Sequence, residues 1–469
     1  MKHGNGNGKR VIGLETEYGC LADRDLDLSQ VLTEVRNWVF EGGRFGMIDL
    51  YEREWDEPAG NGGFLFNGGR LYIDMGHIEY CTPECLNARD AVRYDRAGDR
   101  LLQTAVRALG YEGRVFFIRN NIDHHTGATF GCHENFSMDR LAPFSEANIL
   151  SLLAFLTLRL LYTGAGRVGA AGGRFSVGWP DQEPVFEGFQ LSQRADYVQN
   201  DFYEWVQHNR AIVNTRDEPL ADPLAYRRLH LLHGDTNVFP ATTFLKLGTT
   251  RLVLDLLEAD ALPPVVLQDA VSALRRISRQ TDPPWRVRDS RGRERDVIDL
   301  LDRYRRAAAR CFSGRNEETD TLLELWGDTL EGLARGDAGE LAGRIDWVGK
   351  RELLDAFRRE QGLGWNDPWM QSQDLEFHHI DPQRGLGCAL ADCDGFWATG
   401  CIENAMTEPP EGSRAGARSR LMREIEKSGG RYHLDWDRVN FPGGRTFCMK
   451  DPFETRADHQ ETSGSTSFS

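Results

Sequence analysis

The chain has 469 residues, of which 40% are hydrophobic and 27% are charged, values typical of a folded globular enzyme and unlike those of a disordered or fibrous protein. Its formal net charge is −16, so it lacks the basic surface that non-specific binding to nucleic acid or to an anionic membrane requires. We therefore expect no nucleic acid and no membrane among its partners.

The chain ends and the cysteines indicate a cytoplasmic protein. The first ten residues contain no apolar run, which argues against a secretory signal. The most apolar stretch, 149–161, is interrupted by polar residues and is too short to cross a bilayer, so it predicts a buried helix. The nine cysteines are scattered and form no Cys-x-x-Cys pair, which favours reduced thiols.

The first predicted element is a strand over Val11 to Tyr18. Apolar Ile12 and Leu14 alternate with Glu15 and Glu17, so both carboxylates lie on the face opposite the apolar one. A glycine-rich segment, 58–69, then leads into a second strand over 70–74, where Arg70, Tyr72 and Asp74 share a face. Two strands therefore each present polar groups on one side.

The remaining elements alternate between helices and strands before a long helical region. Helices are predicted over 31–40, 88–109 and 144–162, strands over 115–118 and 132–138, a mobile loop over 164–173, and mostly helix from 249 to about 357. Strands interleaved with helices, followed by a helical stretch, indicate an α+β fold on a largely antiparallel sheet.

A change of composition near residues 385–395 predicts a domain boundary. We expect a flexible N-terminus over 1–10, a catalytic domain over 11–390, a small C-terminal domain over 396–453, and a disordered tail over 454–469 that is rich in Ser, Thr and charge.

The strongest chemical signal is the gathering of oxygen ligands in two short segments. Glu15 and Glu17 share one strand face, and Tyr72, Asp74 and Glu79 follow in the second segment. Like charges on a shared face repel, so a cation is the natural compensator, and oxygen ligands with nucleotide phosphates favour Mg²⁺. The alternative is a solvated sheet face whose glutamates pair with arginines.

Further polar segments contain His133, His230 and Arg216. Arg70 and Arg216 are candidates to hold phosphates or a substrate carboxylate through their forked donors. For Arg216 an ion pair with Asp217 or Glu218 is an open alternative.

Many separate motifs in this chain resemble those of the Pup ligase and Pup deamidase/depupylase family. They run in order from Val11 to about Phe453 and include Gly13-Leu-Glu-Thr-Glu-Tyr-Gly19, Asn67-Gly-Gly-Arg-Leu-Tyr-Ile-Asp74, Glu79-Tyr-Cys-Thr-Pro-Glu84, Gly131-Cys-His-Glu-Asn135, Leu191-Ser-Gln-Arg194, Tyr226-Arg-Arg-Leu-His230 and Leu245-Lys-Leu-Gly-Thr-Thr250.

The resemblance implies a glutamine-synthetase-like fold, in which a curved, largely antiparallel sheet packed with helices cradles ATP and Mg²⁺, with a small C-terminal domain. By the same resemblance Asp74 is the catalytic base, and Arg70, Thr82 and Trp436 contact ATP. The implied metal ligands are Glu15, Tyr72 and Glu79, with Glu17, His133 and His230 near the metal. The expected partners are a Pup-like protein modifier and lysine-bearing target proteins, and the enzyme is expected to be a monomer.

The two branches of that family catalyse opposite reactions, and the motifs favour the ligase. Glu15 and Asp74 are joined by a ligase-like stretch without the long insertion of the hydrolytic branch, and the segment 445–453 resembles the ligase C-terminus. The Asp74 to Glu79 spacing and the segment 188–197 look more like the depupylase. A depupylase or deamidase therefore remains the alternative, followed by a silent modifier-binding adaptor and a small-molecule glutamate–amine ligase.

Overall fold

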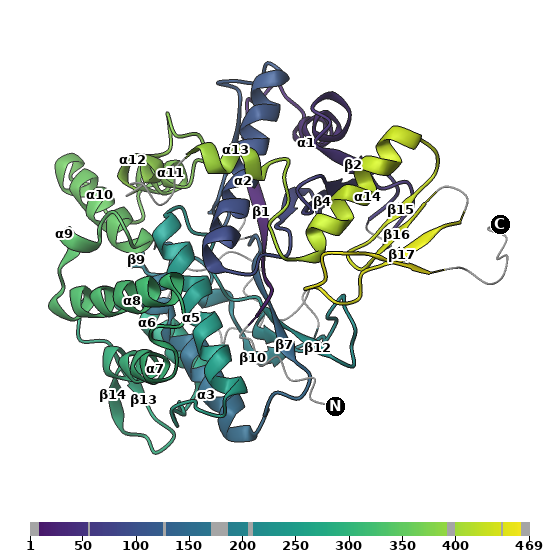
Figure 1. Ribbon diagram of the computed structural model, residues 1–469. Helices are drawn as coiled ribbons and strands as arrows, with labels where there is room; N and C mark the ends of the chain where they lie inside the picture. The colour runs from purple at the N-terminus through teal and green to yellow at the C-terminus, as the bar shows by residue number, and fades with distance from the viewer. Residues whose placement is uncertain are drawn as a thin grey trace.

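A computed structural model describes residues 9–54, 57–124, 128–169, 186–204, 210–391, 399–441 and 444–460 of the chain, and its ribbon is shown in Figure 1. Side chains are not described at 399, 400 and 458–460. Within these ranges the fold is α+β, as the sequence predicts, with one large sheet and a surrounding set of helices.

The large sheet has ten strands in the order β10-β11-β12-β7-β1-β5-β4-β3-β2, with β6 pairing with the far end of β1. All neighbours are antiparallel except β10 and β11. The strands are β1 (Ile12–Ala22), β2 (Gly46–Ile48), β3 (Gly62–Leu65), β4 (Arg70–Asp74), β5 (His77–Cys81), β6 (Val115–Ile118), β7 (Cys132–Asp139), β10 (Asn200–Tyr203), β11 (Ala211–Asn214) and β12 (Tyr226–Leu231).

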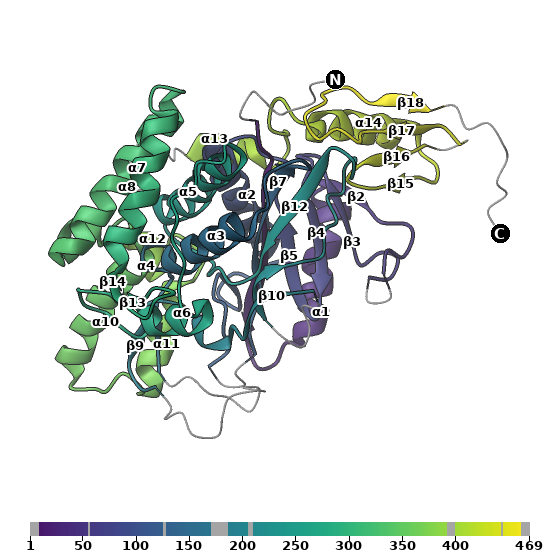
Figure 2. The same ribbon diagram turned by 90° about the horizontal axis from the view of Figure 1, so that it is seen from below.

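Helices pack along one side of this sheet, with α7 and α8 beyond α2, α3 and α5 (Figure 2). The helices before residue 300 are α1 (Leu28–Asn37), which continues into the π-helical turn η1 (Trp38–Gly42), α2 (Ala88–Ala108), α3 (Glu146–Leu158), α4 (Leu160–Thr163), α5 (Pro240–Glu258), α6 (Ala270–Ser278) and α7 (Val297–Phe312). The later ones are α8 (Glu317–Arg335), α9 (Ala338–Leu341), α10 (Asp346–Gln361), α11 (Pro368–Phe377), α12 (Leu386–Leu390), α13 (Thr399–Ala405) and α14 (Arg414–Ser428).

Three smaller sheets complete the fold. They pair β8 (Arg167–Val168) with β9 (Phe189–Gln190), pair β13 (Arg286–Arg288) with β14 (Glu294–Asp296), and join β15 (His433–Leu434), β16 (Arg438–Asn440), β17 (Thr446–Cys448) and β18 (Asp458–Gln460). A short 3₁₀ turn, η2 (Ala195–Tyr197), follows β9. The β13–β14 hairpin was not predicted from the sequence, and it interrupts the region expected to be mostly helical.

The alternation of β1 determines which face of the sheet carries the polar residues of the candidate site. Ile12, Leu14 and Tyr18 are buried against the helices, and the Tyr18 hydroxyl donates to Asp99 of α2 at 2.8 Å. Glu15 and Glu17 therefore point to the opposite face, as predicted. Helix α2 lies within the predicted range 88–109. The Asn87 side chain accepts from the Asp90 N–H at its start, and Gly110, at φ +72°, follows its end.

Two segments differ from the sequence-based expectation. Gly164 to Gly169, expected in a mobile loop, is buried, because a Cβ on Gly164 would lie 2.1 Å from the Leu191 carbonyl oxygen and Arg167 pairs with Asp196 at 3.2 Å. Residues 170–173 lie outside the described residues. Part of the expected tail is ordered, since β18 pairs with β17. Residues 461–469 lie outside the described residues.

The N-terminal boundary is similarly displaced. Residues 1–8 lie outside the described range, but Arg10 is only 2% exposed and pairs with Asp255 at 3.1 Å and Glu258 at 2.9 Å. The buried guanidinium ties the start of β1 to α5.

A second apolar core lies at the β2–β3 edge of the large sheet. Met47, Phe64 and Phe66 of the sheet pack there against Met422 and other residues of α14 and the small sheet that follows it. The C-terminal elements therefore pack on one edge of the large sheet through an apolar core that is separate from the main one. Figures 1 and 2 show them at that end of the molecule.

The apolar stretch around α3 and α4 reaches the length of a membrane span. Glu146 to Thr163 covers 18 residues at a mean hydropathy of 1.2. The statement that this apolar stretch is too short to cross a bilayer is therefore wrong. However, 78% of this window is buried inside the protein, which agrees with the predicted core helix.

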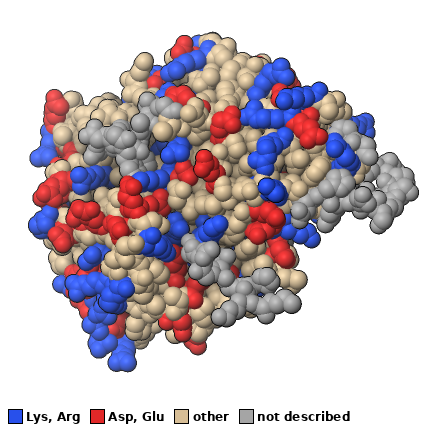
Figure 3. Space-filling view, in the orientation of Figure 1, with Lys and Arg blue, Asp and Glu red and all other residues tan. Residues whose placement is uncertain are grey.

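Basic and acidic side chains are interspersed over the face seen in Figure 3. Basic groups gather at its lower left, where Figure 1 has the β13–β14 hairpin, whose arginines 286, 288, 291 and 293 are exposed.

Candidate active site

The register of five adjacent strands brings the polar residues of the candidate site together on one face of the sheet. Glu15 of β1 lies opposite His133 of β7, and Glu17 lies opposite Glu79 of β5. Glu79 in turn lies opposite Tyr72 of β4. On β12, His230 pairs with Asn135 of β7, which extends the face by one strand. Side chains from distant parts of the sequence thus meet on one surface.

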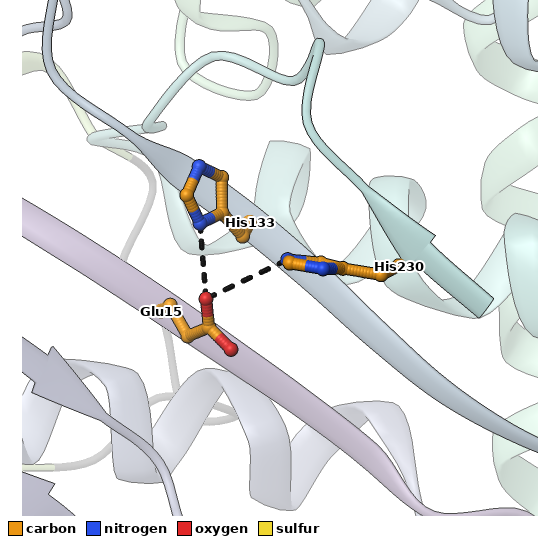
Figure 4. Close-up of side chains that lie close together, drawn as sticks. All are labelled: Glu15, His133 and His230. Atoms are coloured by element: carbon orange, nitrogen blue, oxygen red, sulfur yellow. Dashed lines mark hydrogen bonds and ion pairs between the residues drawn. The ribbon is translucent and has the colours of Figure 1, made fainter. Parts of the chain in front are cut away.

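The first group of side chains is Glu15, His133 and His230, shown in Figure 4. One carboxylate oxygen of Glu15 lies 2.9 Å from Nδ1 of His133 and 3.7 Å from Nε2 of His230. The other oxygen accepts from the Asn135 amide at 2.8 Å. Their ligand atoms all lie within 4.8 Å of one another, so the three side chains are close enough to share one ion.

The charge states of this group suit a cation. Burial raises the pKa of Glu15, but the hydrogen bond from His133 and the charges of His133 and His230 outweigh it and hold the pKa well below its usual value. Burial lowers the pKa of His230, so its ring is neutral near pH 7. Neither ring nitrogen of His230 has a hydrogen-bond partner among the described residues, although both are buried. An ionised carboxylate and a neutral imidazole are the forms that bind metals.

The second group is Glu17, Asp74 and Glu79, whose oxygens also lie within 4.8 Å of one another. A tight turn between β4 and β5 brings Asp74 to this position, since Met75 has φ +44° and Gly76 has φ +89°. Two successive positive φ values are typical of the type I′ turn that suits the twist of a hairpin. The exposed Met75 side chain occupies a position that usually takes Asn, Asp or Gly.

The acidic groups of this second cluster repel one another. Burial raises the pKa of Glu79 well above its usual value, and the charges of Glu15, Glu17 and Asp74 add to the increase. Burial and the Glu79 charge likewise raise the pKa of Tyr72. A carboxyl held protonated by its neighbours becomes a good ligand when a divalent cation replaces the proton.

A glycine allows the close approach around Glu17. A Cβ on Gly131 would lie 2.3 Å from a Glu17 carboxylate oxygen and 2.8 Å from Nε2 of His133. The Gly131 carbonyl accepts from the Glu17 N–H at 3.2 Å. A larger residue here would push apart the two groups of ligands, which explains a glycine between β7 and the preceding loop.

A cavity of about 240 Å³ opens beside the first group. Glu15 and Tyr72 line this cavity, and so do the predicted nucleotide contacts Arg70, Thr82 and Trp436. The structure therefore brings together these three residues, although Trp436 is separated from Thr82 by more than three hundred positions in the sequence.

Within the cavity wall, Arg70 is held by carboxylates. Its guanidinium donates to Asp49 at 3.0 Å and to Glu57 at 2.6 Å, and stacks 4.3 Å from the centre of the Tyr72 ring. The Thr82 hydroxyl oxygen accepts from the Leu14 N–H at 3.0 Å. Both side chains are thus fixed in position by contacts with the sheet and the loop before it.

Arg216 lies outside this cavity lining. Its side chain is 48% exposed and pairs with Glu218 at 2.8 Å and, more loosely, with Glu54 at 3.8 Å. This is the ion pair that the sequence left open as the alternative to a phosphate contact.

Two arginines near Glu17, the buried Arg194 and the partly exposed Arg210, received no role from the sequence. Burial lowers the pKa of Arg194, and the charges of Glu17, Cys132 and Asp235 oppose that effect. Two of its nitrogens, Nε and Nη1, are buried without a partner among the described residues. Burial and the Arg194 charge lower the pKa of Arg210 to about 10.

The charges of the two guanidinium groups repel each other, and an anion bound beside both would relieve that repulsion. Arg194 belongs to the motif Leu191-Ser-Gln-Arg194, which could have identified it, whereas nothing in the sequence around Arg210 marks that residue.

Comparison with known proteins identifies the relatives of this chain. The profile of the Pup-ligase protein family matches residues 10–440. A Pup–protein ligase of Nakamurella multipartita is 33% identical over 470 residues, which cover 96% of this chain and 98% of the relative. A depupylase of Acidothermus cellulolyticus is 37% identical over 373 residues, but these cover 76% of this chain and 71% of the relative.

Solved structures agree with the sequence comparison. The complex of the prokaryotic ubiquitin-like protein Pup with its ligase PafA matches with a TM-score of 0.80 at 31% identity, over 95% of this chain and 90% of that chain. The ligase PafA in complex with ADP matches with a TM-score of 0.74 at 31% identity, over 94% and 93%.

Proposed function

This chain belongs to the Pup-ligase protein family, and on that premise we propose that it is an ATP-dependent ligase acting in the cytoplasm. It joins the side-chain carboxylate of the C-terminal glutamate of a Pup-like modifier to a lysine of a target protein, which marks the target for proteasomal degradation. The observation that carries the proposal is the continuity of the carboxylate groups on the sheet with the cavity lined by Arg70, Thr82 and Trp436.

The cavity is the proposed site of ATP. Trp436 and the apolar part of the wall suit the adenine ring, and Arg70 lies toward the sheet, where it suits the phosphates. The reactive end of the nucleotide then points to Glu15 and Tyr72, beside the two ligand groups. The ADP bound to the related ligase supports a nucleotide in this family.

The residues on the sheet fit Mg²⁺. Glu15, Tyr72 and Glu79 would hold the ion, and Glu17, His133 and His230 would lie beside it. Two observations support this: both ring nitrogens of His230 are buried without a hydrogen-bond partner among the described residues, and burial and neighbouring charges raise the pKa of Glu79. When bound, Mg²⁺ neutralises charge on the phosphates of ATP and supplies an electrostatic contribution to phosphoryl transfer.

The first chemical step activates the carboxylate. A carboxylate oxygen of the modifier attacks the γ-phosphorus of ATP, and the bond from that phosphorus to the β–γ bridging oxygen breaks. ADP is released, and the modifier carries an acyl phosphate. Arg194 and Arg210 are the side chains that would balance the negative charge of the incoming carboxylate and the transferred phosphoryl group, because their own mutual repulsion is relieved by an anion.

The second step forms the isopeptide bond. Only a neutral amine attacks a carbonyl, so Asp74 takes a proton from the lysine ammonium. The amine then adds to the acyl carbon, the bond from that carbon to the phosphate oxygen breaks, and the second amine proton departs with the phosphate. Asp74 ends β4 at the edge of the cluster, where the type I′ turn holds it close to Glu17 and Glu79.

The alternative is the reverse hydrolysis, as in the depupylase relative, with Asp74 as nucleophile or as the base for water. The comparisons favour the ligase, because the ligase relative spans nearly the whole of both chains and the depupylase match does not.

Mass measurement separates the two activities. Pure protein is incubated with a Pup-like modifier ending in glutamate, a lysine-bearing protein, Mg²⁺ and ATP, and conjugates are read as intact masses. We expect a new species at the combined mass less one water, with release of ADP and phosphate. A parallel incubation with a preformed conjugate tests the alternative, and cleavage without any new conjugate would overturn the ligase.

A further inference from the structure

The wall of the nucleotide cavity that contains Trp436 depends on one buried carboxylate. Glu84, just after β5, is 6% exposed and lines the cavity. It accepts from Nε of Arg414 at 2.6 Å and from Nη2 of Arg418 at 2.6 Å, both on α14. The two arginines are buried as well, at 3% and 0% exposure. A single glutamate therefore ties the C-terminal helix to the sheet.

Arg418 connects Glu84 to Trp436. Its Nη1 donates to the Trp436 carbonyl oxygen at 2.7 Å and to Glu84 at 3.1 Å, while Nη2 also donates to the Gly68 carbonyl oxygen at 2.6 Å. The guanidinium carbon lies 5.0 Å from the centre of the Trp436 ring, within the range of a cation–π contact. Backbone and ring of the tryptophan are thus both held by one side chain.

The aromatic packing continues the same arrangement. Phe64 of β3 lies 5.2 Å from the Arg418 guanidinium and meets the Trp436 ring edge to face, with ring centres 5.1 Å apart. Two neighbours of Trp436 in space, one from the sheet and one from α14, therefore set the orientation of its ring toward the cavity.

We propose that Glu84 and Arg418 are positioning residues for the nucleotide, which act through Trp436 by fixing its ring at the cavity wall. The inference rests on the proposed function, because it assumes that the cavity binds ATP. Arg418 is not part of the cavity lining, so it influences the nucleotide only through the residues that it orients. Loss of either positioning residue should weaken nucleotide binding and leave the chemistry at Asp74 unchanged.

The test compares KM for ATP with kcat in purified full-length variants. Arg418→Lys keeps the charge beside Glu84, but a single ammonium cannot span Glu84, Gly68 and Trp436 at once. We expect KM for ATP and the Kd of ADP to rise on the order of tenfold, with kcat at saturating ATP little changed. Glu84→Gln should act in the same direction.

A double-mutant cycle shows whether the effect passes through Trp436. In a Trp436→Ala background, Arg418→Lys should change KM for ATP by less than about twofold, because the residue it positions is gone. Arg423→Lys is the matched control, since Arg423 lies on the same helix and stacks on Phe66 at 4.8 Å but does not line the cavity. We expect that control to leave KM for ATP unchanged.

Three outcomes would overturn the inference: an unchanged KM in Arg418→Lys, an equal rise in KM with and without Trp436, or a loss of kcat at constant KM. Circular dichroism and thermal unfolding identify a variant that has not folded, and in that case the decision rests on the other member of the pair. Failure of the proposed function would give a different result, because the wild-type protein itself would then bind no ADP.

Discussion

Glu17 of β1 and Glu79 of β5 lie directly opposite each other in an antiparallel pair of strands. Like charges in this position destabilise a sheet, and burial has raised the pKa of Glu79 well above its usual value, with further contributions from Glu15, Glu17 and Asp74. The acidic groups around Glu79 repel one another, and a divalent cation bound among them would relieve this repulsion.

The first prediction concerns Mg²⁺ and pH. Because Glu79 has a raised pKa when folded, the metal-free protein loses stability as pH rises from the unfolded pKa toward the folded one, and a cation competes with the proton of Glu79. Mg²⁺ should therefore raise Tm more at about pH 8 than at about pH 6. Differential scanning fluorimetry with and without MgCl₂ measures this.

Glu79→Gln is the variant that checks the source of the effect. It should lose most of the Mg²⁺-dependent rise in Tm, whereas Glu331→Gln on the exposed surface of α8 should retain it. An equal Mg²⁺ response in wild type and Glu79→Gln would remove Glu79 from the ligand set.

The second prediction concerns Asp74. Asp74→Asn should lower the rate of conjugate formation by roughly a hundredfold or more, because the lysine ammonium loses its base. ADP binding should persist, since Asp74 does not line the nucleotide cavity. Conjugation is measured by intact mass and ADP affinity by calorimetry. If nucleotide affinity falls in parallel with activity, Asp74 is structural.

The third prediction concerns Glu15. Glu15→Ala removes the carboxylate that His133 and His230 surround, so the Mg²⁺ concentration for half-maximal activity should rise on the order of tenfold or more. A titration of activity against Mg²⁺ at saturating ATP measures the change. Unchanged metal dependence would exclude Glu15 as a ligand.

The fourth prediction concerns Asp235, which holds the segment that contains Arg194. Its buried carboxylate accepts from the backbone N–H groups of Ala165, Gln193 and Arg194 and from the Ser192 hydroxyl at 2.9–3.2 Å. Asp235→Asn keeps the shape of the side chain but replaces one of its two acceptor oxygens with an NH2 donor, so kcat should fall while KM for ATP changes little. Steady-state kinetics measures both constants. A rise in KM alone would contradict an effect through Arg194.

The fifth prediction concerns the acid stability conferred by Glu84. Arg418 and Arg414 outweigh the effect of burial and lower the pKa of Glu84 to about 2, so its contribution is present above the unfolded pKa and is lost as pH falls toward 2. Glu84→Gln should cost about 3 kcal/mol at pH 7, because two arginines lose their buried partner.

The difference between wild type and Glu84→Gln should then narrow as pH falls below about 4.5. Urea unfolding at a series of pH values measures the difference. A gap that stays constant down to about pH 3 would show that the ion pairs do not lower this pKa.

Local sequence signals predicted the elements that depend on short-range periodicity. The alternation of β1 gave the faces of Glu15 and Glu17, and the helical periodicity of 88–109 gave α2, because side-chain direction depends on neighbours a few residues away. Glycine-rich segments were less informative, since β3 lies within one of them and the buried Gly164 to Gly169 within another.

The sequence by itself determined the α+β class, the family and the residues from which the site is built. Only the tertiary structure decided that Glu17 faces Glu79 and that Arg194 and Arg210 lie close enough for their charges to interact. It also decided that Arg418, more than three hundred residues after Glu84 in the sequence, contacts both Glu84 and Trp436. Strand register and the packing of distant helices are set by burial summed over the whole core, which leaves no periodic trace in any one segment.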